Sequence, residues 1–206
     1  VRDRLMQTST EKDMSGCNAA QRNSRLKSLM GEETNNNAEN SKPIADLFPN
    51  CTVMFADIAG FTAWSSMREP SQVFTLLETI YHEFDVFAKR RRVFKVETVG
   101  DCYVAVAGLP EPRKDHHIVM ARFASDCLHK FSVLTKKLEV RLGPDTGDLG
   151  LRTGLHSGQV TAGVLRGEKS RFQLFGDTVN TTARIETTGE RDKIHISQEY
   201  AELLIS

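Results

Sequence analysis

Apolar residues recur with helical periodicity in two long stretches of the chain. The first ends in four consecutive cations at residues 89–92, and the second runs from about Asp115 to Leu138. Spacings of three and four predict amphipathic helices that bury one face, and cations favour the C-terminal end of a helix. The apolar stripe of the first helix consists of Val73, Leu76, Leu77, Ile80, Tyr81, Phe84 and Phe87.

Short runs rich in β-branched and aromatic residues predict strands. Residues 51–57 form the first, and two more flank Gly100-Asp101, which is a hairpin signal. The order βαββαβ, followed by further elements, predicts an α+β fold with a ferredoxin-like antiparallel sheet covered by helices on one face. The later predicted strands are 93–99, 102–107, 151–156, 160–165, 171–175 and 193–197, with a short helix from about Asp177.

The first 45 residues differ in composition from the rest. They are polar and poor in aromatic residues, and they include a Gly-, Asn- and Pro-containing stretch from Gly31 to Pro43. Such a segment buries too little apolar surface to offset the entropy of ordering. We therefore expect residues 1–45 to form a polar, partly disordered linker and residues 46–206 to form the folded domain.

Composition and charge exclude several classes of protein. Hydrophobic residues make up 39% and charged residues 26% of the 206 residues, which is typical of a globular chain with a sizeable core. Lys plus Arg and Asp plus Glu number 27 each, so no basic field attracts nucleic acid. The four cysteines form no CxxC pair, which favours a reducing compartment. We find neither a run of 18 apolar residues nor a signal-peptide pattern.

Two aspartates fall at the ends of predicted central strands. Asp57 ends the first strand and Asp101 lies in the hairpin turn, so both carboxylates could converge on one point. Hard divalent cations bind one or two carboxylates together with substrate phosphates, which makes the pair candidate ligands for Mg²⁺ or Mn²⁺. Each aspartate taken alone is better explained as a turn or capping residue.

Two further features suit a phosphorylated ligand. Gly60-Phe61-Thr62 follows the first aspartate and would open a helix, whose N-terminal amides bind phosphate. Asn180 and Arg184 are four residues apart, on one face of the short helix. The guanidinium could stabilise a reacting phosphoryl group and the amide could orient a ribose oxygen, although an exposed polar helix face also explains such a pair.

Four motifs occur in the order found in the class III nucleotidyl cyclases, the family of adenylate and guanylate cyclases. They are FADIAGFT at 55–62, KVETVGD at 95–101, GLHSG at 154–158 and FGDTVNTTAR at 175–184. The match extends from about Leu47 to Leu204. The resemblance implies an enzyme that converts a nucleoside triphosphate to a 3′,5′-cyclic monophosphate and pyrophosphate. The non-enzymatic alternative is a catalytically silent cyclase-like module that dimerises.

The resemblance also implies roles for individual residues. Two Mg²⁺ or Mn²⁺ ions would be held by Asp57, Asp101 and the Ile58 carbonyl, and would activate the ribose 3′-hydroxyl for attack on the α-phosphate. Asn180 would orient the ribose and Arg184 would stabilise the pentavalent transition state. The active sites would lie at a head-to-tail homodimer interface, with the aspartates from one protomer and the Asn and Arg from the other.

Base selection is expected to depend on Glu97 and Gln173. Family members that use ATP usually carry Lys at the first position and Asp or Thr at the second, whereas guanylate cyclases carry Glu and commonly Cys. Glu97 matches the guanylate type. Gln173 matches neither, because its amide can donate to guanine O6 or accept from adenine N6. We therefore expect GTP to be favoured, with ATP as the alternative substrate.

Two departures from the family pattern concern the triphosphate. In the hairpin before Phe172, where the family usually has a basic residue, this chain has Glu168, with Lys169 and Arg171 as candidate replacements. The chain also ends before the strand pair that carries a phosphate-binding lysine in the family, so we expect a truncated domain. Its first residues, VRDRL, resemble the end of a receptor-cyclase linker. We therefore expect an upstream sensor or receptor region and a cytoplasmic location.

Overall fold

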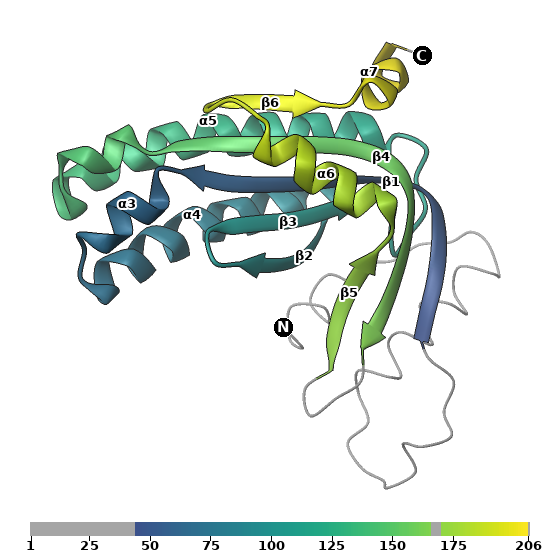
Figure 1. The fold of residues 1–206 in the computed structure, drawn as a ribbon, viewed down its shortest axis with the longest axis horizontal. Coiled ribbons are helices and arrows are strands. Elements are labelled where there is room, and N and C mark those ends of the chain that lie inside the picture. Colours follow the sequence, from purple (N-terminus) through teal and green to yellow (C-terminus); the bar gives the residue numbers. More distant parts are fainter. Residues whose placement is uncertain (1–43, 166–169, 206) are drawn as a thin grey trace, which may run out of the picture. The chain divides into compact units, whose positions relative to one another are not determined.

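A six-stranded sheet forms the centre of the fold (Figure 1). The structure is a computed structural model that describes residues 44–165 and 170–205. The strand order is β2-β3-β1-β4-β5, with β6 paired to β4. Neighbouring strands along this path are antiparallel, and β6 runs parallel to β4. The strands are β1 (Ile44–Ala59), β2 (Phe94–Val99), β3 (Cys102–Ala107), β4 (Gly150–Leu165), β5 (Arg171–Phe175) and β6 (Lys193–Ile196).

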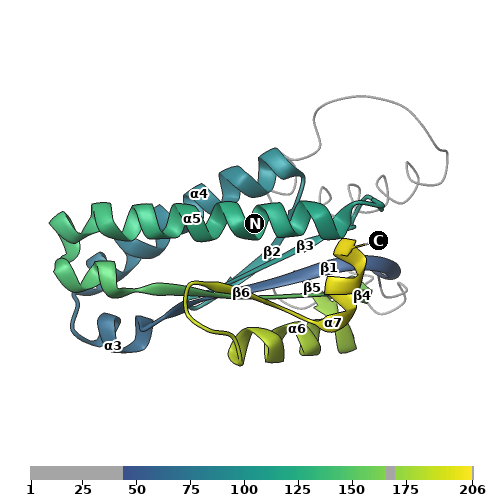
Figure 2. The same ribbon diagram turned by 90° about the horizontal axis from the view of Figure 1, so that it is seen from above.

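Helices cover both faces of the sheet (Figure 2). The long helices α4 and α5 pack on one face, where they bury a cluster that includes Phe84, Tyr103 and Phe123. Helix α6 crosses β4 on the other face. No helix within the described residues is long and apolar enough to span a membrane. The helices are α3 (Phe61–Ser66), α4 (Pro70–Arg91), α5 (His116–Leu142), α6 (Asp177–Thr187) and α7 (Gln198–Ile205), with a 3₁₀ turn at Pro144–Asp148.

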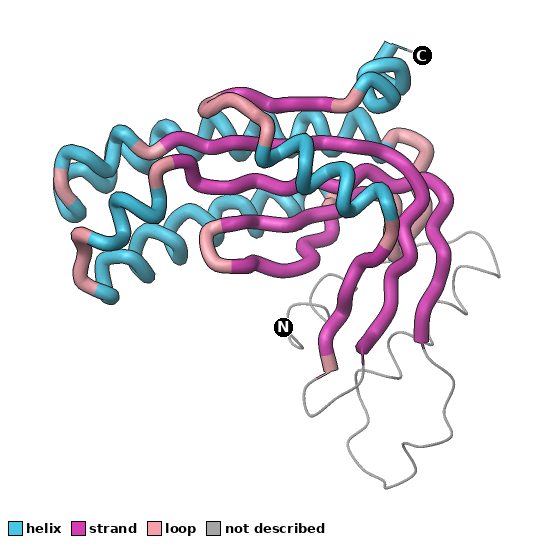
Figure 3. Tube along the Cα trace, in the orientation of Figure 1, coloured by secondary structure: helices cyan, strands magenta, loops and turns pink. Residues whose placement is uncertain are grey.

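The predicted βαββαβ order and α+β class are confirmed, and two details of the prediction are wrong. The segments 151–156 and 160–165 form one continuous strand that curves along its length (Figure 3), because the polar stretch between them stays in the ladder, with Gly158 opposite Cys51. The helices lie on both faces, because α6 packs against β4 on the face opposite α4 and α5. The strand β1 begins at Ile44, near the expected domain boundary, and the expected linker otherwise lies outside the described residues.

Two glycines of β4 allow α6 to approach the sheet closely. Gly154 and Gly158 are four residues apart and therefore share one face of the strand. A Cβ atom at Gly154 would lie 2.4 Å from the backbone nitrogen of Glu186, and one at Gly158 would lie 2.5 Å from Oγ1 of Thr178. The helix backbone therefore rests directly on the strand.

A buried polar chain links the start of α5 to the central strands. Oγ1 of Thr52 lies 2.7 Å from Nδ1 of His116 and 2.6 Å from Oγ of Ser157. All three side chains are buried. Burial lowers the pKa of His116, and the neighbouring charges of His117 and Arg113 lower it further, whereas Asp115 opposes the shift. The folded protein therefore favours the neutral imidazole.

Replacing Gly154 by alanine is expected to destabilise the protein by about 1–3 kcal/mol, because the new methyl group would overlap helix backbone that cannot move independently. Gly158→Ala is the matched control and should cost less, because its methyl group would meet the end of the Thr178 side chain. Urea unfolding of both variants measures the difference. Equal losses would contradict this account of the contact between α6 and β4.

The free energy of unfolding should fall as the pH drops below about 6.5, the ordinary pKa of histidine. Because the pKa of His116 is lowered in the folded state, the unfolded chain binds the proton more readily. This contribution is complete above that pH and is lost below it. Urea unfolding at about pH 7 and about pH 5 should show a smaller decrease for His116→Gln than for the wild type. His129→Gln, an exposed change on the same helix, should leave the decrease intact.

Candidate active site

Asp57 and Asp101 lie close together at one end of the central strands. Asp57 is near the end of β1 and pairs with Cys102, the first residue of β3. Asp101 is the residue before Cys102 and lies in the turn between β2 and β3. Burial raises the pKa of Asp101, and the neighbouring Asp57 raises it further through its charge and a side-chain hydrogen bond. The predicted convergence of the two carboxylates is therefore present within one chain.

The surroundings of the two aspartates suit a cation. Burial raises the pKa of the Cys102 thiol to about 12, and the carboxylates of Asp57, Glu186 and Asp101 contribute to this shift. Burial and the same two aspartates also raise the pKa of Tyr81. These shifts indicate a local excess of negative charge, which a divalent cation would relieve.

The protein alone offers an incomplete set of metal ligands. Within residues 44–165 and 170–205, no three His, Cys, Asp or Glu side chains are arranged to hold a metal ion together. The Ile58 side chain is buried in the core cluster, so only its backbone could take part. The two carboxylates, a carbonyl and substrate phosphates are the oxygen ligands that Mg²⁺ and Mn²⁺ accept. The residues present therefore fit such an ion when substrate contributes the remaining ligands.

Arg152 occupies the place beside Asp57 and is not among the residues singled out from the sequence. It lies opposite Asp57 in the pairing of β4 with β1. Its Nη2 donates to Oδ2 of Asp57 at 2.7 Å, and its Nε donates to Oε1 of Glu186 at 3.1 Å. The side chains of Asp57 and Arg152 are 21% and 31% exposed, and that of Glu186 is 9% exposed. Only the strand register, which was not known from the sequence, could have identified this cation.

A β-bulge sets the direction of Glu97. In the pairing of β2 with β3, Lys95 lies opposite Ala105 and Glu97 lies opposite Val104, so Val96 is an extra residue. Alternation along β3 places Val104 on the same face as Cys102, the partner of Asp57. The bulge therefore turns Glu97 toward the sheet face that carries Asp57. Without it, the side chain would share the face of Lys95, which pairs with Asp85 of α4 at 2.8 Å.

Gln173 lies in β5 and is half-buried. It pairs with Gly163, whereas its neighbour Phe172 turns to the other face and packs against Phe94 with ring centroids 4.9 Å apart. Phe94 and Glu97 share a face of β2 because of the bulge. Within one chain, the structure therefore does not bring Gln173 and Glu97 onto the same sheet face.

The two faces of α6 differ in exposure. Thr178, Thr182 and Glu186 are buried against the sheet, whereas Asn180 and Arg184 are exposed. The predicted polar pair therefore lies together on the outer face of the helix. The inner face, through Glu186, adjoins Arg152 and Asp57 of the same chain.

The remaining predicted phosphate-binding residues are placed in part. Gly60 precedes α3 with φ of 89°, a left-handed conformation that suits glycine, and Phe61 and Thr62 form the first turn of that helix. Arg171 is exposed at the start of β5. Lys169 lies outside the described residues.

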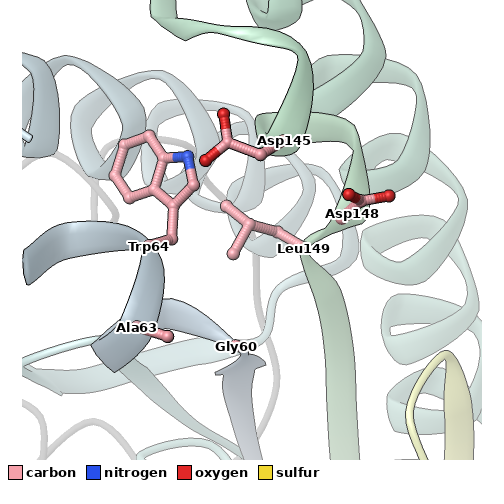
Figure 4. A pocket seen from close by; sticks show the side chains of 6 residues that line it. All are labelled: Gly60, Ala63, Trp64, Asp145, Asp148 and Leu149. Atoms are coloured by element: carbon pink, nitrogen blue, oxygen red, sulfur yellow. The ribbon is translucent and has the colours of Figure 1, made fainter. Parts of the chain in front are cut away.

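A cavity of about 260 Å³ adjoins Gly60 and the first turns of α3 (Figure 4). Trp64 and Asp145 face each other across it, and Arg68 stacks over the Trp64 ring at 5.1 Å while pairing with Asp145. Of the predicted site residues that the structure describes, only Gly60 lines the cavity. It is lined by Gly60, Ala63, Trp64, Asp145, Asp148 and Leu149.

Comparison with known proteins links this geometry to a family. The receptor-type guanylate cyclase gcy-28 of Caenorhabditis elegans is 44% identical over 161 residues, which are 78% of this chain and 12% of that protein. Atrial natriuretic peptide receptor 2 of Homo sapiens is 43% identical over 154 residues, which are 74% of this chain and 14% of that protein. The chain thus spans only a small part of these relatives.

Solved structures and a family model agree with these relatives. The guanylate cyclase domain of RhGC from Catenaria anguillulae, in complex with GTP, has 37% identity and a TM-score of 0.70, with 77% of this chain and 84% of that chain covered. The adenylyl cyclase CyaB from P. aeruginosa has 26% identity and a TM-score of 0.71, with 78% and 82% covered. The model of the adenylate and guanylate cyclase catalytic domain matches residues 44–206. The chain therefore belongs to the adenylate and guanylate cyclase catalytic domain family, the class III nucleotidyl cyclases.

Proposed function

We propose that this chain is the catalytic part of a nucleotide cyclase that converts GTP to its 3′,5′-cyclic monophosphate and pyrophosphate. The observation that carries the proposal is the pair of carboxylates, Asp57 and Asp101, held together at the end of the central strands and surrounded by excess negative charge. Family membership supplies the reaction class.

Each residue of the proposed site has a distinct task. Asp57, Asp101 and the carbonyl of Ile58 would hold two Mg²⁺ or Mn²⁺ ions. When bound, such ions supply Lewis-acid activation of the attacking hydroxyl and neutralisation of phosphate charge. Gly60, Phe61 and Thr62 contact the triphosphate directly after the aspartate, where the left-handed Gly60 turns the backbone.

Asn180 and Arg184 are proposed to act in a site completed by a second copy of the chain. Asn180 orients the ribose, and Arg184 stabilises the charge that develops on the reacting phosphoryl group. The exposure of both residues supports this assignment, because they lie on the outer face of α6 while Glu186 on the inner face adjoins Arg152 and Asp57. In a homodimer with shared sites, the aspartates of one protomer would meet the Asn and Arg of the other.

Guanine is the proposed base because Glu97 faces the Asp57 side of the sheet. Its carboxylate only accepts hydrogen bonds and can pair with the adjacent N1–H and N2–H₂ donors of guanine, whereas adenine presents a lone pair at N1. Gln173 lies on the other sheet face within one chain, so its contact with O6 of the base stays a prediction. The alternative is ATP, because the amide of Gln173 can also accept a hydrogen bond from adenine N6.

The whole protein is proposed to contain an upstream sensor or receptor region that drives this domain in the cytoplasm. Receptor-type guanylate cyclases among the relatives support this context, and the chain matches only 12% of gcy-28.

Replacing either Asp57 or Asp101 by asparagine should lower cyclic nucleotide production by more than about 100-fold with Mg²⁺ and with Mn²⁺, because each change removes a metal ligand. Asp46→Asn, an exposed change on the same strand, is the matched control and should keep full activity.

A mixture of Asp101→Asn and Arg184→Ala chains should regain activity, because each heterodimer would contain one intact site.

Near-normal activity of a folded aspartate variant would contradict the metal assignment. Subunit exchange without recovery would contradict the shared site. A folded wild type that makes no cyclic product from either nucleotide would favour a silent, dimerising module.

The wild type should prefer GTP over ATP by about 10- to 100-fold in kcat/KM, the discrimination expected of one bidentate pair. The double variant Glu97→Lys with Gln173→Asp should prefer ATP, because it places a donor against adenine N1 and an acceptor against N6. Measuring kcat/KM for both nucleotides tests this. A wild type that prefers ATP would overturn the guanine assignment and leave the cyclase assignment standing.

A further inference from the structure

Glu186 is a buried carboxylate of α6 that has no role in the proposed reaction. It accepts a hydrogen bond from Nε of Arg152 at 3.1 Å, while Nη2 of the same guanidinium donates to Asp57 at 2.7 Å. We propose that Glu186 is a positioning residue that holds Arg152 beside Asp57. Helix α6 then serves one active site of the dimer through its outer face and the other through its inner face. This inference rests on the shared site proposed above.

The backbone around Glu186 fixes the position of its carboxylate. The backbone nitrogen of Glu186 lies against Gly154, where even a methyl group would come within 2.4 Å. Its side chain is 9% exposed, and Oγ1 of Thr187 lies 3.4 Å from its second oxygen. Burial and the charge of Asp57 raise the pKa of Glu186, whereas Arg152 opposes the shift. The carboxylate therefore has one strong cationic partner, and that partner is also bound to Asp57.

The charge balance explains what Glu186 contributes. Arg152 is shared between Asp57 and Glu186 through different nitrogens, so it can leave one carboxylate while remaining bound to the other. Asp57 must give up Nη2 of Arg152 before both of its oxygens are available to a divalent cation. With Glu186 ionised, the guanidinium keeps a partner when this happens. Without the charge of Glu186, Arg152 competes more strongly with a divalent cation for Asp57, and the affinity of the site for divalent cations falls.

The geometry assigns the two faces of α6 to different active sites. Asp57, Arg152 and Glu186 are connected within one chain. Asn180 and Arg184 are on the opposite face of the helix and complete the site of the partner protomer. A substitution at Glu186 should therefore change cation binding in the site built from the aspartates of its own chain.

Glu186→Gln tests this proposal, because glutamine has nearly the same volume and keeps an acceptor for Nε but lacks the charge. The Kd for Mn²⁺, measured without nucleotide by electron paramagnetic resonance of the free ion, should rise about tenfold, as expected from losing one charge-assisted contact. The kcat at saturating Mn²⁺ should change less than about threefold. Glu190→Gln removes one exposed carboxylate nearby and should leave the Kd unchanged.

An Arg152→Gln background separates positioning from simple charge attraction. If Glu186 acts through Arg152, adding Glu186→Gln to this background should change the Kd for Mn²⁺ by less than about threefold. A tenfold effect that persists would mean that Glu186 acts by its charge alone and would overturn the proposal. An unchanged Kd in folded Glu186→Gln would overturn it as well.

Heterodimers test the assignment to one of the two sites. In a dimer of Asp101→Asn and Arg184→Ala chains, the intact site takes its aspartates from the Arg184→Ala chain. Glu186→Gln should raise the Mn²⁺ concentration for half-maximal activity only when it is in that chain, although α6 there carries no catalytic arginine. An effect only from the other chain would overturn the inference. If the heterodimer without Glu186→Gln is inactive, the shared site itself fails, and the Mn²⁺ measurements still judge the contact between Glu186 and Arg152.

Discussion

The antiparallel pairing of β1 with β4 determines the geometry of the whole site. It places Arg152 directly opposite Asp57, and it presents Gly154 and Gly158 on the face where α6 packs. The same strand β4 holds β6 at one part of its length and β5 at another. A slip of one residue in this pairing would turn Arg152 and both glycines to the opposite face. The positions of the carboxylates, of Arg152 beside Asp57 and of α6 therefore all depend on the register between β1 and β4.

The site is arranged around negative charge that the described residues beside it balance only in part. Asp57, Asp101 and Glu186 are close enough to raise the pKa of neighbouring groups, and Arg152 is the cation shared by two of them. Asp57 disfavours the ionisation of Asp101, and such a close approach of carboxylates is unfavourable for stability and favourable for cation binding. The site therefore favours the binding of positively charged ligands.

Much of the fold follows from periodicity in the sequence, and the main exceptions have physical causes. Helices α4 and α5 were predictable because their apolar stripes face a core, whereas α6 buries threonines and Glu186, so its inner face has no apolar pattern. The aspartates, Asn180 and Arg184 were identifiable from motifs. Arg152 and Glu186 were not, because their roles depend on contacts between residues 34 apart in the sequence, which only the register and the glycine contact create.

The bulge at Val96 has a consequence for how nucleotide selectivity can change in this fold. Glu97 faces the Asp57 side only because one extra residue interrupts the alternation of β2. Regular pairing without the bulge would place Val96 opposite Val104 and would turn Glu97 to the α4 side, whereas deletion of Val96 itself would leave Glu97 opposite Val104. The direction of Glu97, which we propose reads the base, therefore depends on the backbone of β2 as well as on the identity of the residue. A change of pairing in this hairpin would therefore alter the proposed base contact without any substitution at Glu97.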